Sequence, residues 1–149
     1  MDLMHRHIKT TDISASDMLR AKGFRVTSGK IHLLALLEKA GSPLSIQSIL
    51  KIWKGKQPDQ TTLYRSLADL HTSGIVRRID LNTGVAHFEY APSRPHHHHI
   101  VCTNCGVIEE IEQCSVGTLQ KKIVHKSPLF KSITTHNLEF FGHCNKCAV

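Results

Sequence analysis

The cysteines place the strongest constraint on how this chain of 149 residues can fold. Four of the five form two Cys-x-x-Cys pairs: Cys102 with Cys105, and Cys144 with Cys147. Two residues between cysteines allow both thiolates to bind one ion, and two such pairs complete the tetrahedral sulfur shell that zinc prefers. The pairs therefore predict a structural Zn²⁺. Reduced buried thiols or a redox Cys-x-x-Cys motif are the alternatives.

Disulfides are a poorer interpretation of the same cysteines. Their number is odd, and the N-terminal sequence MDLMHRHIKTTD lacks the apolar segment of a secretory signal. No stretch approaches the about 18 consecutive apolar residues that cross a bilayer. We therefore expect a soluble, cytoplasmic protein with no membrane partner. Cys114 lies outside both pairs, and we interpret it as a small hydrophobic residue at a helix start.

The charge of the chain is unevenly distributed. Lys and Arg outnumber Asp and Glu by 19 to 12, a net charge of +7. Residues 1–95 carry 14 basic and 8 acidic side chains, and residues 96–149 carry 5 and 4. An excess of +6 in the first part suits a polyanion such as nucleic acid, because neutralised phosphates release counterions. A merely solvated basic face is the alternative.

The first part of the chain has the periodicity of short helices followed by a hairpin. Caps and apolar spacing predict helices from Ser14 or Ser16 to Gly23, from Thr27 to Gly41 and from Ser45 to Gly55, and a fourth over residues 61–74. Residues 75–79 and 85–91 read as strands joined by a Leu-Asn-Thr-Gly turn. This order predicts a winged helix-turn-helix over residues 14–91, after a flexible tail at 1–13. The segment Pro-Ser-Arg-Pro at 92–95 is the predicted hinge.

Beyond the hinge the pattern changes to strands at 98–102, 107–111 and 130–141, with one helix over 115–126. A segment this short buries little apolar surface by itself. We therefore expect metal binding or dimerisation to stabilise residues 96–149. The predicted fold class is α+β: an N-terminal winged helix-turn-helix followed by a small α/β dimerisation domain with a structural zinc, residues 96–149.

Four consecutive histidines, residues 96–99, precede the first cysteine pair. Side chains alternate along an extended strand, so His97 and His99 share one face, and His96 and His98 share the other.

The same alternation places His87 beside Glu89 on the second strand of the hairpin. Imidazoles and a carboxylate from both sides of the hinge indicate a second, mixed N/O metal site, which Glu110 could join.

Several blocks of the sequence together resemble one family. TTLYRSLADLHTSGIV, HFEYA, HHHHIVCTNCG and THNLEFFGHCNKC are similar, in order and spacing, to the blocks of the ferric uptake regulator superfamily of bacterial metal-responsive transcription factors. The resemblance covers about residues 14–147. It implies an N-terminal winged helix that binds double-stranded operator DNA, a C-terminal domain that forms a homodimer, a structural zinc and a regulatory metal at the hinge.

The resemblance also implies roles for individual residues. It places the structural zinc on the four paired cysteines, and a regulatory Zn²⁺ or Fe²⁺ on Glu89 or His87 with His97, His99 and Glu110. An additional metal site in some members would use His96, His98 and His143, but its usual glutamate falls near Gly117 in this chain. The expected DNA-binding residues are Arg25, Thr61, Thr62, Tyr64 and Arg65.

The predicted function is a metal-dependent, DNA-binding transcriptional repressor that controls metal homeostasis. Zinc is slightly favoured over iron(II) as effector, because the histidine that iron sensors commonly supply before the third helix is replaced by Ser42-Pro43. Zinc sensors commonly have His or Asp where this chain has Arg77. A zinc-dependent enzyme that uses the His/Glu cluster is a competing class, although the sequence has no His-Glu-x-x-His motif. A peroxide-sensing or redox-sensing regulator of the same family, through Cys114 for example, is the third.

Overall fold

The computed structural model describes residues 14–92, 96–112 and 116–148. The chain divides after Arg94 into two compact units. The predicted tail, most of the predicted hinge and Cys114 lie outside the described residues. Within the described ranges, no helix has both the length and the apolar character needed to cross a membrane.

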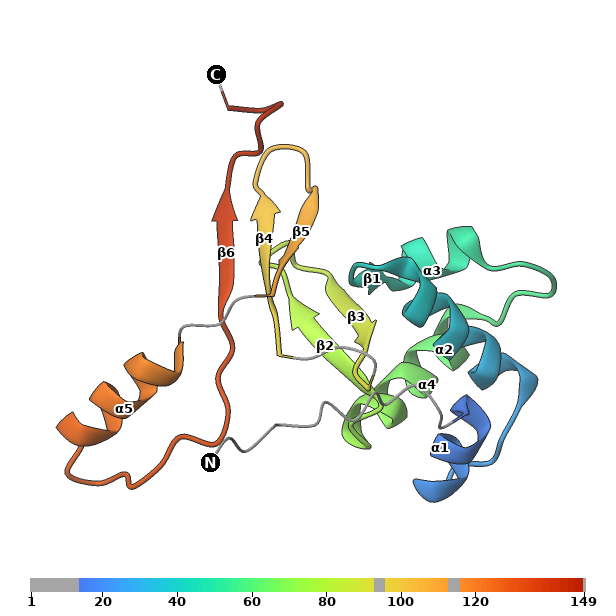
Figure 1. Cartoon of the computed structure of the whole chain (residues 1–149). Helices are drawn as coiled ribbons and strands as arrows, with labels where there is room; N and C mark the ends of the chain where they lie inside the picture. Colours follow the sequence, from blue (N-terminus) through green and yellow to red (C-terminus); the bar gives the residue numbers. More distant parts are fainter. Residues whose placement is uncertain (1–13, 93–95, 113–115, 149) are drawn as a thin grey trace, which may run out of the picture. The chain divides into compact units, whose positions relative to one another are not determined.

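The first unit combines four helices with a small sheet (Figure 1). Its strands have the order β1-β3-β2, and all neighbours are antiparallel. The predicted hairpin is confirmed: β2 and β3 are joined by a turn in which Asn82 and Gly84 have φ of 55° and 74°, a conformation that Asn and Gly tolerate best. The elements are α1 (Ala15–Ala21), α2 (Ser28–Ala40), β1 (Leu44–Ser45), α3 (Ile46–Ile52), α4 (Gln60–Thr72), β2 (Val76–Asp80) and β3 (Ala86–Tyr90).

Side-chain caps begin these helices at predicted positions, and for the first helix the cap is Ser14 rather than Ser16. Ser14, Thr27 and Ser45 each accept a hydrogen bond from the backbone N–H three residues ahead. α4 begins one residue before the predicted start because Asp59 is its cap, and Asp59 accepts from both the N–H and the hydroxyl of Thr62. α3 ends at Ile52 rather than near Gly55, because the next residue is already extended.

The core of the first unit lies between α2, α4 and the sheet. Leu34, Leu67 and Leu70 are at most 1% exposed, whereas Tyr64, on the flank of the leucine stripe of α4, is 52% exposed. The leucine stripe of α4 therefore holds the helix against the unit and leaves the other face toward solvent.

The second unit contains β4 (His98–Cys102), β5 (Ile108–Ile111), α5 (Val116–Lys126) and β6 (Glu139–Gly142). The strand order is β5-β4-β6, with β4 antiparallel to β5 and parallel to β6. The predicted strand over 130–141 is largely wrong: only its last three residues, with Gly142, pair with β4. Residues 130–138 lead toward β4 without a strand partner among the described residues.

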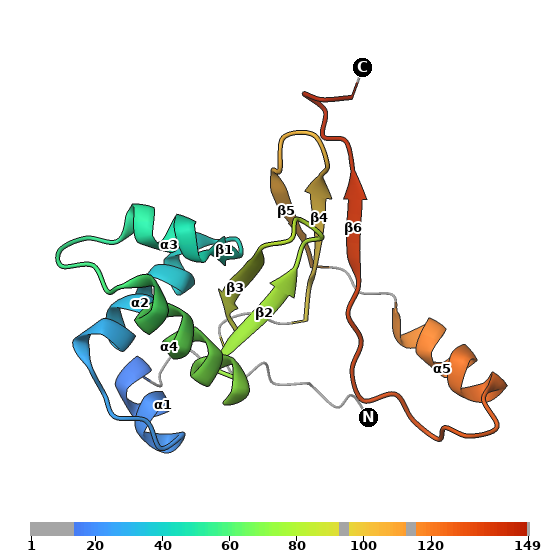
Figure 2. The same cartoon turned by 180° about the vertical axis from the view of Figure 1, so that it is seen from behind.

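α5 buries none of its residues, and Figures 1 and 2 show it standing apart from the sheet of its own unit. Several apolar side chains of the second unit are exposed by about 40% or more. They include Leu119, Ile123, Phe140 and Phe141. Exposed apolar side chains that lie together are typical of a surface that binds another protein.

Candidate metal centres and DNA-binding helix

The four paired cysteines converge at one point of the second unit. All four are free thiols, and their Sγ atoms lie within 4.8 Å of one another. The Sγ atoms of Cys105 and Cys144 are 3.7 Å apart. Two sulfurs on one tetrahedral zinc lie about 3.8 Å apart, because each Zn–S bond is about 2.3 Å. The donor set and its spacing therefore fit zinc.

The backbone around Cys102 favours a thiolate. Cys102 ends β4, and Gly106 closes the following turn with φ of 75° and donates its N–H to the Cys102 carbonyl. Hydrogen bonds from the backbone N–H groups of Cys105 and Cys144 lower the pKa of the Cys102 thiol to about 5. Thiolate is the form of cysteine that binds metal.

Cys147 has the opposite tendency. Its contact with Asn104 lowers the pKa of the thiol, but the neighbouring Cys144 and Cys105 sulfurs outweigh that effect, and the pKa rises to about 12. Four thiols this close compete for the same protons, and a divalent cation would replace those protons.

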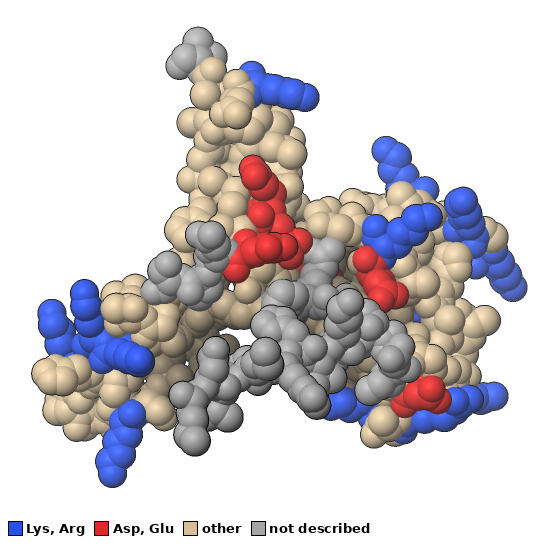
Figure 3. Space-filling view, viewed as in Figure 1, with Lys and Arg blue, Asp and Glu red and all other residues tan. Residues whose placement is uncertain are grey.

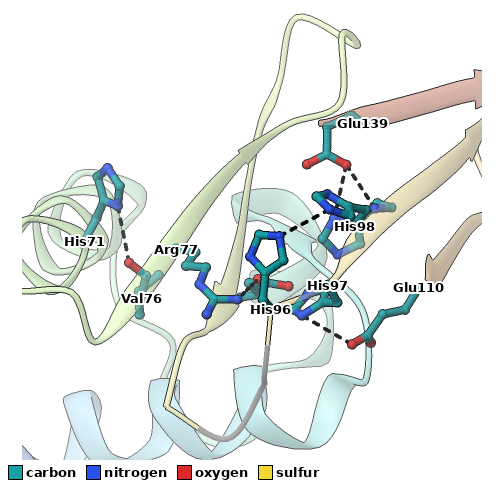
Figure 4. A network of polar contacts seen from close by, with 10 residues as sticks. His71, Val76, Arg77, His96, His97, His98, Glu110 and Glu139 are labelled. Carbon is teal, nitrogen blue, oxygen red and sulfur yellow. Dashed lines mark hydrogen bonds and ion pairs between the residues drawn. The ribbon is translucent and has the colours of Figure 1, made fainter. Parts of the chain in front are cut away.

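The second-unit residues predicted for the regulatory site lie together on one face of the sheet. The rings of His97 and His99 are 4.9 Å apart between centroids, and His97 Nδ1 is 3.5 Å from a Glu110 carboxylate oxygen (Figure 4). Glu110 is also the β5 residue directly opposite His99. Two imidazoles and a carboxylate are suitable ligands for zinc or iron(II).

The remaining predicted ligands, His87 and Glu89, belong to β3 of the first unit. Glu89 forms an ion pair of 3.3 Å with Arg77, its cross-strand neighbour on β2. His87 Nδ1 is 2.9 Å from the Val85 carbonyl. Their participation in the regulatory site stays a prediction, as does the choice between them.

Sequence reasoning missed Glu139, the first residue of β6. Its carboxylate is 3.2 Å from both Nδ1 and the backbone N of His99. Parallel pairing of β6 with β4 makes Glu139 the direct neighbour of His99 across 40 residues of sequence, and no local pattern could indicate that pairing.

A second histidine cluster lies on the other face of β4. The Nε2 atom of His96 is 3.2 Å from Nε2 of His98 and 2.9 Å from Nε2 of His136. Two nitrogens on one tetrahedral zinc lie about 3.3 Å apart, because each Zn–N bond is about 2.05 Å. The donor set therefore fits zinc, and His96, His98 and His136 form one of the groups able to hold a metal.

The third histidine of this cluster is not the one expected from sequence. The expected residue, His143, comes directly after Gly142, the last residue of β6. Gly142 pairs with Cys102, so His143 lies at the end of the sheet where β4 finishes. His136 instead precedes β6, at the end where β4 begins, and this places its ring beside His98. The chain direction of β6 thus selects His136 over His143.

Two neighbours orient the cluster. His98 Nδ1 is 2.9 Å from the Leu138 carbonyl, so that nitrogen carries the proton and Nε2 is left as the metal-binding atom. Gln120 of α5 lies 2.8 Å from His136 Nδ1. Position 117, where the resemblance expects a glutamate, is a glycine one turn before Gln120.

The predicted DNA-binding residues lie in the first unit and are exposed. Thr61, Tyr64 and Arg65 stand on α4 away from its leucine stripe, Thr62 is exposed but bound to Asp59, and Arg25 precedes α2. Lys and Arg side chains stand out from the helical part of this unit in Figure 3. This arrangement is suitable for binding phosphates.

Comparison with known proteins identifies the family. The model of the ferric uptake regulator family matches residues 21–141. The ferric uptake regulation protein of Neisseria gonorrhoeae is 33% identical over 132 residues, which cover 87% of this chain and 90% of the relative. The chain belongs to the ferric uptake regulator family.

Solved ferric uptake regulators have the same fold. The Vibrio cholerae protein superposes with a TM-score of 0.74 at 29% identity, covering 87% of this chain and 98% of that one. The Francisella tularensis regulator, solved with iron, gives 0.72 at 29% identity and covers 84% and 95%. The predicted α+β fold is confirmed.

Membership in the ferric uptake regulator family also decides the functional class. The chain is a metal-responsive, DNA-binding transcriptional regulator, and the alternative of a zinc-dependent enzyme is wrong.

Proposed function

We propose that this regulator is a repressor whose DNA binding requires a metal ion held by His97, His99 and Glu110 of the second unit and by Glu89 or His87 of the first. The observation that supports this proposal most directly is the placement of His97, His99 and Glu110 on one face of the β5-β4-β6 sheet. An ion bound there would supply the positive charge that draws ligands from both units together.

Metal ligands that come from both units would allow the ion to regulate DNA binding. When the units share an ion, the orientation of the winged helix is restricted, and one orientation can suit DNA. Metal affinity and DNA affinity must then increase each other by the same factor.

DNA recognition would require two copies of the chain. A homodimer presents two α4 helices, and helices about 34 Å apart can enter successive major grooves of an operator. The exposed apolar residues of the second unit, Leu119 and Ile123 of α5 among them, supply a surface for the second copy.

Two further ions complete the proposal. A structural Zn²⁺ binds the four paired cysteines, supported by their sulfur spacing. An additional ion binds His96, His98 and His136, supported by the convergence of their Nε2 atoms. Three imidazoles without a carboxylate suit zinc better than manganese.

For the regulatory ion the two candidates are zinc and iron(II). The lack of a histidine before α3 favours zinc, since Ser42 and Pro43 occupy that place. The similarity to ferric uptake regulation proteins, and to a regulator solved with iron, favours iron(II).

The test is DNA binding by chelator-treated, full-length protein, measured anaerobically by fluorescence anisotropy with zinc, iron(II) and manganese(II). The DNA is a sequence selected by the metallated protein from a random pool. The variants are His97→Ala and His99→Ala, with His125→Ala as control because His125 is an exposed histidine of α5. Sedimentation of each sample gives its oligomeric state.

We expect one metal to raise wild-type affinity, and both site variants to lose most of that increase while the control keeps it. The metal that gives the largest increase in affinity for DNA at saturation is the effector, because N/O sites bind zinc more tightly than iron(II) or manganese(II) whether or not zinc activates the protein. Metal-stimulated binding that survives both His97→Ala and His99→Ala would overturn the proposed regulatory site.

A further inference from the structure

Glu139 contacts His99 at two points. One carboxylate oxygen of Glu139 lies 3.2 Å from His99 Nδ1 and 3.2 Å from the backbone N of the same residue. The Glu139 side chain is only 18% exposed, so water competes weakly for these contacts. Figure 4 shows the carboxylate of Glu139 directed at β4.

A carboxylate at Nδ1 determines which nitrogen of the ring can bind metal. Ionised glutamate only accepts hydrogen bonds, so the ring must carry its proton on Nδ1. The lone pair then remains on Nε2, and the carboxylate also increases the basicity of the imidazole.

The register of the sheet places an acidic residue on each side of His99. Glu110 on β5 and Glu139 on β6 are both its direct neighbours, and directly paired residues point to the same face of a sheet. Glu110 also lies 3.5 Å from Nδ1 of His97. Two carboxylates beside two imidazoles give this face the negative charge that attracts a divalent cation.

We propose that Glu139 is a positioning residue of the regulatory metal site: it accepts a hydrogen bond from the Nδ1–H of His99 and fixes the ring with Nε2 toward the ion. This inference rests on the proposed function, in which His99 binds the regulatory ion.

If Glu139 had a purely structural role, that role would depend on its contact with the backbone N of His99. Glu139 begins β6, and its carboxylate accepts the backbone N–H of His99 beside the first pair of the parallel ladder. Loss of that bond would lower the stability of the second unit and would leave the intrinsic metal affinity of a folded site unchanged.

Cobalt(II) binding separates the two roles, since its visible absorption reports the ligands and geometry of the site. Full-length protein that retains its cysteine-bound zinc is titrated with Co²⁺ against a competing chelator. All variants carry His136→Ala, which removes the other histidine cluster. The test variants are Glu139→Leu, which cannot accept a hydrogen bond, and Glu139→Gln, whose amide oxygen can. The control is Glu109→Gln, an exposed glutamate of β5 paired with Ile100.

We expect Glu139→Leu to weaken Co²⁺ binding about 10- to 100-fold and to alter the spectrum, as loss of a ligand's hydrogen-bond partner does. Glu139→Gln should restore the spectrum and part of the affinity, and Glu109→Gln should match the reference protein. If Glu139→Leu does not fold, Glu139→Ala, which also lacks an acceptor, takes its place: an unchanged spectrum with an affinity within twofold of the reference overturns the inference.

His99→Ala in the same assay distinguishes the two levels of the proposal. Weaker Co²⁺ binding by His99→Ala with unchanged binding by folded Glu139→Leu overturns the role of Glu139 alone. Unchanged binding by both overturns the regulatory site, and the role of Glu139 with it.

Discussion

Arg65 is the cation best placed on α4 to meet DNA. It is exposed, next to the half-exposed Tyr64, on a helix whose opposite side is buried. An arginine that reads a guanine edge contributes about 1–3 kcal/mol of discrimination, whereas one that contacts only phosphate weakens binding to all sequences and lowers the salt slope by about one.

We therefore expect Arg65→Ala to reduce affinity for the selected DNA by about tenfold or more. Binding to that DNA and to a scrambled sequence, each at several salt concentrations, distinguishes base reading from phosphate contact. Lys39→Ala on α2 is the control for loss of one exposed charge. Unchanged affinity of Arg65→Ala for both DNAs would remove α4 from the interface.

His136 and His143 offer a matched pair for testing the three-histidine cluster. His136 Nε2 lies 2.9 Å from His96 Nε2, whereas His143 follows the far end of β6. We expect His136→Ala to lose one equivalent of zinc that His143→Ala retains, as measured by zinc titration against a chromophoric chelator. Equal loss in the two variants would contradict this choice of ligand.

At the scale of the element, α4 depends on its cap. The side chain and backbone N–H of Thr62 donate to Asp59 and hold the pKa of that carboxyl below its ordinary value. A group with a lowered folded pKa stabilises the fold above its unfolded pKa, about 4, and loses that effect as pH falls through the folded pKa.

We predict that Asp59→Ala lowers the melting temperature near pH 6 and that its difference from wild type shrinks as pH is lowered toward 3. Circular dichroism melts of both proteins across this range measure the effect. A difference that is independent of pH would show that the charge of Asp59 does not act on the helix.

Truncation of the buried leucine stripe of α4 should reduce stability more than loss of the Asp59 cap. Leu67 is 0% exposed, and truncation of a buried leucine to alanine costs about 2–5 kcal/mol. We expect Leu67→Ala to reduce the free energy of unfolding of the first unit by this amount. Trp53, the single tryptophan, lies in the first unit, so urea unfolding followed by its fluorescence reports this unit. Leu129→Ala, at an 85% exposed position, should leave the transition unchanged.

At the scale of the whole molecule, the two units depend on different forces. The first has a core of buried aliphatic residues, whereas the second buries few and gathers four thiols at the ends of β4 and β6. Metal binding and folding are linked in such small domains.

We predict that Cys102→Ser releases one zinc and unfolds the second unit, while the Trp53 transition of the first unit persists. Metal analysis, amide exchange of the second unit and tryptophan fluorescence measure the three parts. Cys114→Ser, outside both pairs, should keep the zinc. A zinc-free Cys102→Ser protein with a folded second unit would contradict the structural role of the metal.

Local sequence patterns determined much of this protein. The caps Thr27 and Ser45, the leucine stripe of α4 and the Leu-Asn-Thr-Gly turn depend on neighbours within a few residues, so periodicity and turn chemistry suffice to predict them. The cysteine spacing likewise predicted which thiols would meet.

Only the tertiary structure decided which distant residues join the histidines of β4. Glu139 and His136 lie about 40 residues from their partners and reach them because β6 runs parallel to β4, in a register that pairs His99 with Glu139. Parallel pairing requires a long connection and leaves no local signature, so the same sequence suggested a strand over 130–141 and, as third histidine, His143 in place of the His136 that lies beside His98. That register is essential to the contact, because a shift by one residue would turn the acidic side chain to the other face of the sheet.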